Sequence, residues 1–252
     1  MAQTAKPVQL KTQTVEAFDG YIREAEAAME QTSTASGLFL WSDVDPARAQ
    51  QVRKGQVVAQ FWAGRGPVKV PEGLIHDWIG ALLIPGVTVK NTLALIQNYD
   101  NHKNIYKPEV IDSKLLSHDD GDFEIYLRLL KKKIITVVLD TDHAVQYRSL
   151  SRSRWVCRSC TTRIAEVENA GSSKEKVLAP DTGYGFLWRL NSYWRFQERE
   201  GGVYVECRAI SLTRDVPFGL GWAIEPIIQK LPKESLIHTL EATRQALPAE
   251  AK

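Results

Sequence analysis

Short extended segments and tight-turn sequences alternate between residues 110 and 213, and this alternation constrains the fold more than any other feature. Asp119-Asp-Gly121 is a strong hairpin signal because Asp and Gly tolerate the positive φ angles that such turns need. The predicted strands are Val110–Ser117 and Phe123–Leu130 around that turn, Ile134–Leu139 and Ala144–Tyr147 around a turn at Asp140–Asp142, Trp155–Val167, and Tyr184–Glu198 and Val203–Thr213 around Glu200–Gly202. Consecutive hairpins predict an antiparallel sheet.

One long helix is predicted to follow the last strand, over about Leu220–Leu247. Its apolar stripe has the period of one helical face and comprises Leu220, Ile224, Ile227, Ile228, Leu231, Leu236, Leu240 and Leu247. Pro232 is expected to kink or restart this helix. Since a single helix after a run of strands must cover one face of their sheet, the fold class is α+β.

The first part of the chain has a different pattern. A helix is predicted at about Thr14–Gln31, a strand at Gln56–Trp62, a buried strand at Leu74–Ile84 and a second helix at about Val89–Asn101. We therefore expect an accessory segment at residues 1–69 and the main domain at residues 70–248.

The alternation of side chains within the strands predicts space beneath the final helix. Ile125, Leu127 and Leu129 share the inward face of one strand, and the even positions of Tyr184–Glu198, including Trp188 and Trp194, share that of another. The inward residues of the following strand are smaller: Val203, Val205, Cys207, Ala209 and Ser211. Large rings beside small side chains are consistent with an apolar ligand cavity, and equally with an ordinary tight core.

Three stretches resemble a bacterial member of the START-like, or SRPBCC, helix-grip superfamily: Leu74–Gly80, Gln97–His102 with Ile105–Glu109, and Gly201–Cys207 leading into the last helix. The resemblance spans about Leu74–Leu247 and implies a curved antiparallel sheet wrapped around the C-terminal helix. It also implies binding or transport of a hydrophobic, lipid-like molecule in the enclosed space. The alternative is a cyclase- or hydrolase-like enzyme that acts on an aromatic or polyketide-like substrate there.

The predicted ligand-binding residues come from four strands and the final helix. They are His76, Trp78, Ile125, Leu127, Leu129, Trp188, Trp194, Val205, Cys207, Ala209, Trp222, Ile224, Ile227 and Ile228. His76 is included because it could present one polar group to the cavity. The alternative is that its side chain is hydrogen-bonded within the protein or lies on the surface. No catalytic residue is assigned, because the five histidines and the serines match no hydrolase motif.

Two groups of residues have side chains that can bind a metal, but neither is assigned as a metal or redox site. Cys157-Arg-Ser-Cys160 has the spacing of half a zinc site, but zinc needs four ligands and the two thiols of a strand would face opposite ways. Asp140, Asp142 and His143 could hold a cation, although Asp and Thr are also favoured in turns. We therefore expect neither a metal nor a cofactor.

Net charge and hydropathy limit the classes of partner that this protein is expected to bind. A net charge of +2 lacks the basic excess of a nucleic-acid binder, and no apolar run reaches the roughly 18 residues of a membrane-spanning helix. Lys131–Lys133 and Arg148–Arg158 form a basic strip, interpreted either as solvated strand edges or as a peripheral contact with anionic lipid. We expect a soluble monomer, cytoplasmic as written, and periplasmic or secreted if a signal peptide has been trimmed.

Overall fold

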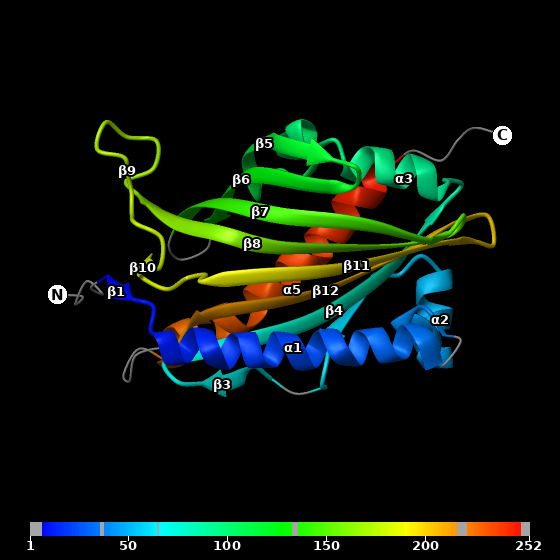
Figure 1. The fold of residues 1–252 in the computed structure, drawn as a ribbon, viewed down its shortest axis with the longest axis horizontal. Helices are drawn as coiled ribbons and strands as arrows, with labels where there is room; N and C mark the ends of the chain where they lie inside the picture. The colour runs from blue at the N-terminus through cyan, green and yellow to red at the C-terminus, as the bar shows by residue number, and fades with distance from the viewer. Residues whose placement is uncertain (1–6, 36–37, 65, 133–135, 216–220, 248–252) are drawn as a thin grey trace.

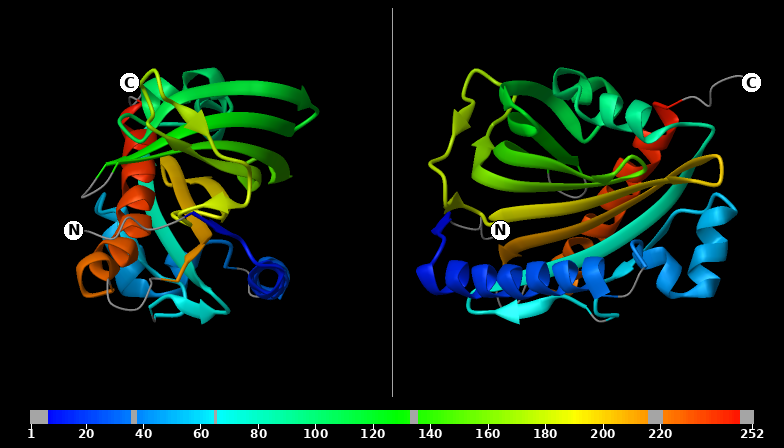
Figure 2. Two further views of the ribbon diagram at one scale, coloured as in Figure 1. Left: turned by 90° about the vertical axis from the view of Figure 1, so that its left-hand side faces the viewer. Right: turned by 45° about the vertical axis from the view of Figure 1, so that its right-hand side comes forward.

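The structure is a computed structural model that describes residues 7–35, 38–64, 66–132, 136–215 and 221–247. Within its helices, the side chains of residues 31–35 and 221–229 lie outside this description. A curved sheet lies between a long N-terminal helix on one face and a long C-terminal helix on the other (Figures 1 and 2). No helix in the described ranges is both long enough and apolar enough to cross a membrane.

The elements follow one another along the chain with short connections. The first part contains β1 (Val8–Gln9), α1 (Thr12–Ala35), η1 (Trp41–Val44), α2 (Pro46–Arg53), β2 (Val58–Phe61), β3 (Val68–Val70), β4 (Gly73–Pro85), α3 (Val89–Ile96), η2 (Tyr99–Asn101) and α4 (His102–Ile105). The second part contains β5 (Val110–Asp119), β6 (Asp122–Lys132), β7 (Thr136–Ser151), β8 (Arg154–Glu168), β9 (Lys176–Val177), β10 (Thr182–Gly183), β11 (Arg189–Arg199), β12 (Gly202–Arg214) and α5 (Gly221–Gln245).

The main sheet has the strand order β2-β4-β12-β11-β8-β7-β6-β5, and all of these neighbours are antiparallel. β3 also pairs with β4, and β9 pairs with β8. The first long strand, β4, is joined to the last strand, β12, although more than a hundred residues separate them in the chain. This long-range pairing places β4, on which α5 packs, beside β12 in the curved sheet (Figure 2).

The two faces of the sheet bury different sets of side chains. On the outer face, Phe18 and Ile22 of α1 pack with Ile75, Ile210 and Leu212. On the inner face, the apolar residues of α5 pack with those of β4, β11 and β12, among them Leu236, Leu240, Leu82, Phe196 and Cys207. The α+β class and the helix-grip arrangement are therefore confirmed, since the C-terminal helix lies against the inner face.

The turn predicted at Asp140–Asp142 is wrong, because β7 continues through these residues. The Asp140 carboxylate accepts hydrogen bonds from Arg128 Nε at 2.7 Å and Tyr126 Oη at 2.7 Å, both from the neighbouring strand β6. Thr141 Oγ1 donates to the Leu127 carbonyl oxygen at 2.9 Å. Polar groups that would satisfy a turn locally are satisfied here by the adjacent strand.

The single strand predicted at Tyr184–Glu198 is also wrong, because β11 begins only at Arg189. Gly185 has a φ of +80°, and a Cβ there would lie 2.3 Å from Cβ of Arg214, so the close crossing of the two segments needs glycine. The Glu166 carboxylate accepts hydrogen bonds from the backbone N–H groups of residues 184, 185 and 186. These contacts hold residues 184–188 out of the strand.

Two smaller expectations are revised. The helix predicted to reach Asn101 ends at Ile96, and η2 and α4 follow it. α5 runs without a restart through Pro232. β2 and β3, from the segment predicted to be accessory, pair directly with β4. The division of the chain near residue 70 stays a prediction.

Candidate functional site

The candidate site is the middle of the inner face, where the strand register brings small side chains together. Trp78 of β4 pairs with Ala209 of β12, Ala209 with Ser192 of β11, and Ser192 with Ser159 of β8. Paired residues on neighbouring strands point to the same side of a sheet. One large ring is therefore followed by three small side chains across three strands.

A second row, with Trp194 as its one large residue, borders these small side chains. Gly80 pairs with Cys207, Cys207 with Trp194, and Trp194 with Cys157. The Trp194 ring is parallel to that of Phe196 at a centroid distance of 6.1 Å, and its Nε1 donates to Ser192 Oγ at 3.2 Å. The indole thus forms one side of the small-residue row and is fixed in place by both contacts.

Part of the inner face is not fully buried. Val205 and Cys207 are fully buried, whereas Ala209, Ser192 and Ser159 keep intermediate exposure although they lie on interior strands. α5 lies closest to β4, with lesser contacts to β12 and β2. The small-residue row extends from β12 toward β8, away from the strand on which the helix packs most closely.

His76 lies beside this row, because it pairs with Ser211 on β12. Its Nε2 is 3.0 Å from Thr213 Oγ1, and its buried Nδ1 has no hydrogen-bond partner in the described part of the chain. Burial lowers the pKa of His76 to about 4, so the imidazole is neutral at pH 7. A neutral imidazole nitrogen can donate or accept one further hydrogen bond, according to the tautomer.

His143 supplies a second buried imidazole on the inner face, which sequence reasoning considered only for a cation. Its Nε2 lies 2.9 Å from Thr141 Oγ1 and its Nδ1 lies 3.4 Å from Ser159 Oγ. Burial, together with a smaller effect of the nearby His102, lowers its pKa to about 4. Among the described residues, no group of three His, Cys, Asp or Glu side chains is arranged to hold a metal ion.

Most of the residues predicted for the site do lie on the inner face. Trp78, Ile125, Val205 and Cys207 belong to one apolar cluster with Leu236 and Leu240 of α5, and the partly buried Trp194 packs against it. Leu127 packs against that cluster, and both Leu127 and Leu129 pack near Ala242 of α5. His76 and Ala209 complete the set through their paired positions. Whether these residues contact a ligand stays a prediction.

Trp188 is the exception, and its placement beside Trp194 is corrected. It is 4% exposed and packs on the outer face with Phe18 and Ile22, because the chain leaves the strand before Arg189. Phe186 is 38% exposed. The predicted side chains Trp222, Ile224, Ile227 and Ile228 lie outside the described residues.

Ser159 and Ser192 lie in the candidate site, although neither was among the ligand-binding residues predicted from the sequence. The alternation within Trp155–Val167 could have shown that Cys157 and Ser159 share a face. Cys157 is buried on the inner face, whereas Cys160 pairs with Asn191 and faces outward, as the strand geometry predicts. All three cysteines are free.

Some residues of the basic strip form ion pairs with carboxylates of the same protein. Lys131 forms an ion pair with Glu109, and Arg158 forms one with Glu26 of α1 at 2.8 Å. Lys133 lies outside the described residues. Peripheral membrane contact through this strip therefore stays a prediction, as do the monomeric state and the compartment.

Because three histidines are buried, we predict that the folded protein loses stability in mild acid. His76, His102 and His143 each have a folded-state pKa lowered to about 4, below the roughly 6.5 expected in the unfolded chain. As the pH falls from 6.5 toward 4, the unfolded state binds protons that the folded state cannot, so the free energy of unfolding falls. The expected loss is on the order of 3 kcal/mol per histidine by pH 4.

Urea unfolding at pH 7.5, 6.5, 6.0 and 5.5 measures this loss. His143→Asn is expected to reduce the slope of unfolding free energy against pH by up to about 1.4 kcal/mol per pH unit. His118→Gln, at an exposed position, is the matched control. Buried Glu166 and Glu206 have raised pKa values and act in the opposite direction, so the lowest pH values are avoided. An unchanged slope for His143→Asn would contradict the prediction.

No protein-family model matches the chain, and no curated protein shows significant similarity to it. Some solved structures are similar to the chain. A STAR-related lipid transfer protein from Xanthomonas axonopodis is 16% identical, covers 72% of this chain and 98% of its own, and superposes with a TM-score of 0.48. The Zhui aromatase/cyclase from a Streptomyces strain is 9% identical, with coverages of 71% and 99% and a TM-score of 0.46.

Human STARD10 is 8% identical, covers 79% of each chain and has a TM-score of 0.44. Lipid transfer and aromatase/cyclase activity both occur in the names of these structures, and identities this low do not distinguish between the two for this chain. The fold assignment itself rests on the strand order and on the position of α5.

Proposed function

We propose that this protein binds a mainly apolar molecule with an uncharged polar group, between the inner face of the sheet and α5. The observation that carries the proposal is the row of Ala209, Ser192 and Ser159, which stays partly exposed on the inner face beside the buried apolar residues of β12. A concave apolar surface with a few polar groups is the usual form of a small-molecule site.

The polar groups of this region favour a neutral ligand. Ser159, Ser192 and Ser211 carry no charge, and His76 is neutral at pH 7 because burial lowers its pKa to about 4. A buried carboxylate with no counter-charge loses its hydration without compensation. A hydroxyl or carbonyl group, in contrast, needs only one or two hydrogen bonds, which the free Nδ1 of His76 and the serine hydroxyls are suited to form.

The lowered pKa values of His76 and His143 favour a binding role over a catalytic one. A general base that works near neutral pH needs a pKa close to 7. His76 and His143 each contact a threonine hydroxyl, and the pKa of each is lowered to about 4. These groups are suited to hydrogen bonding with a ligand, and transport of that ligand is the simplest role for the protein.

A titration with 1-decanol and decanoate at pH 7.5 tests both parts of the proposal. The two molecules have chains of equal length and differ in charge, and binding is followed by native mass spectrometry and tryptophan fluorescence. We expect the alcohol to bind at least ten-fold more tightly than the acid, which corresponds to about 1.4 kcal/mol. If neither binds, the proposed function fails. If both bind equally, the neutral character of the site fails.

Ala209→Trp is expected to fill the small-residue row and weaken decanol binding at least ten-fold. If space is present there, the added indole costs no more than about 1 to 3 kcal/mol of unfolding free energy. The matched control is Ala144→Trp, which adds the same side chain at an exposed position of β7 and should leave binding unchanged. An Ala209→Trp variant that does not fold, together with a wild-type protein that binds neither ligand, would show a filled core.

A further inference from the structure

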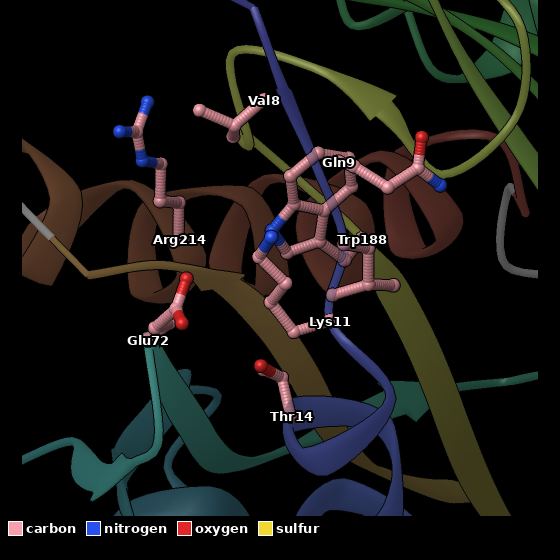
Figure 3. A pocket seen from close by; sticks show the side chains of 8 residues that line it. Val8, Gln9, Lys11, Thr14, Glu72, Trp188 and Arg214 are labelled. Carbon is pink, nitrogen blue, oxygen red and sulfur yellow. The ribbon is translucent and has the colours of Figure 1, made fainter.

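A pocket lies away from the inner face, near the N-terminal end of the described chain. It has a volume of about 410 Å³ and is lined by Val8, Gln9, Leu10, Lys11, Thr14, Glu72, Trp188 and Arg214. Figure 3 shows that β1, the start of α1, the turn before β4, the residues before β11 and the end of β12 all contribute to it. Its volume is in the range of small-molecule sites.

Hydrogen bonds between distant segments hold the walls of this pocket in place. Leu10 N donates to the Asp181 carbonyl at 2.8 Å, and Thr14 Oγ1 donates to the Pro71 carbonyl at 2.8 Å. Trp188 N donates to the Leu212 carbonyl at 2.7 Å. The pocket is therefore formed by the fold itself, and a ligand entering it would not have to order its walls.

The charged groups of the pocket are two cations and one carboxylate. Within the described chain, neither the Arg214 guanidinium nor the Lys11 ammonium has an ion pair or a side-chain hydrogen bond, whereas Glu72 accepts one from Gln13 at 3.4 Å. The nearby Arg189 and Lys69 differ, because they are paired with Asp181 and Asp215. Arg214 and Lys11 are thus available to a ligand.

We propose that this pocket binds a small monocarboxylic acid with an apolar body. The planar guanidinium of Arg214 matches the two oxygens of a carboxylate, and Lys11 adds a second positive charge. Val8, Leu10 and Trp188 supply apolar surface for the rest of the molecule. Glu72 offsets part of the positive charge, which disfavours a dianion such as phosphate. This site is independent of the proposed function.

Benzoate is a suitable probe, and benzyl alcohol and inorganic phosphate are the comparison compounds. Binding to the full-length protein is measured by calorimetry and by the shift of the Trp188 indole N–H resonance, which is assigned with Trp188→Phe. We expect benzoate to bind at least ten-fold more tightly than benzyl alcohol and than phosphate. Arg214→Gln should weaken benzoate binding at least ten-fold, and Lys11→Gln about three-fold.

Arg163→Gln is the charge-matched control, because Arg163 lies on β8 and is paired with Asp142. It should leave benzoate binding within two-fold of the wild-type value. The proposal is overturned if benzoate binds no better than benzyl alcohol, a comparison that needs no variant. Equal losses for Arg214→Gln and Arg163→Gln would also overturn it, since they would indicate attraction by net charge alone. Tighter binding of phosphate would indicate an oxyanion site of another class.

Discussion

A chain that ends at Asp215 is expected not to fold, because it lacks the helix that covers the inner face of the sheet. Leu236 and Leu240 of α5 are buried against β4 and belong to the main apolar cluster. Gly80 lies directly beneath them: a Cβ at this position would lie 2.8 Å from Leu240 Cδ1. Burial of each leucine stabilises the fold by roughly 1.5 to 3 kcal/mol, and a whole domain is stable by only about 5 to 15 kcal/mol.

Single variants separate the contribution of the helix from the effect of truncation. Leu240→Ala is expected to lower the unfolding free energy by about 2 to 5 kcal/mol, because Leu240 is fully buried. Gly80→Ala should also destabilise the protein, since the new methyl group would force the buried Leu240 and Leu236 side chains to shift. Gln245→Ala, at an exposed position of the same helix, should stay within about 0.5 kcal/mol of the wild type.

Near-ultraviolet circular dichroism and urea unfolding measure these effects. The truncated chain should show no cooperative transition and no native aromatic signal. A cooperative transition with a native near-ultraviolet spectrum would show that the sheet does not need α5. A loss in Leu240→Ala no larger than that in Gln245→Ala would lead to the same conclusion.

Asp77→Ala is expected to destabilise the protein by about 3 to 5 kcal/mol, because it leaves the buried Arg208 without its counter-charge. Arg208 donates from Nε and Nη2 to the two carboxylate oxygens of Asp77 at 2.9 and 2.6 Å. The two side chains are 4% and 6% exposed on the outer face of the sheet. The guanidinium also lies 4.0 Å from the ring centroid of Trp62.

The same carboxylate accepts a hydrogen bond from Tyr21 Oη of α1 at 2.7 Å, so Asp77 also connects the helix to the sheet. Burial and the neighbouring carboxylate raise the pKa of Tyr21, which keeps the phenol protonated as a donor. Tyr21→Phe removes only this neutral donor and is expected to cost about 1 kcal/mol. It measures the helix contact separately from the ion pair.

The double variant Asp77→Leu with Arg208→Met tests whether the cost arises from the unpaired charge. Replacing both members of a buried ion pair by apolar residues is often close to neutral. We therefore expect the double variant to recover most of the stability lost in Asp77→Ala, as measured by urea unfolding at pH 7.5. A double variant as unstable as the single one would show that packing, and not the uncompensated charge, carries the effect.

Local chemistry allowed much of the fold to be predicted. The turns at Asp119–Gly121 and Glu200–Gly202 join β5 to β6 and β11 to β12, as their residues indicated. The alternation in Phe123–Leu129 correctly placed Ile125 on the inner face, and the apolar stripe after residue 220 predicted α5. Turn preference and periodicity depend on residues close in the chain, so the sequence contains them directly.

Contacts between distant segments decided the rest. Asp140 lies within a strand because Arg128 and Tyr126 of the next strand satisfy its carboxylate. Trp188 faces α1 because Glu166 binds the backbone just before it. The pairing of Ala209 with Ser192 and of Ser192 with Ser159 depends on register, and a shift by one residue would place these side chains on the opposite face. Alternation within one strand cannot specify that register, since the partner strand and the covering helix determine which pairing buries the most apolar surface.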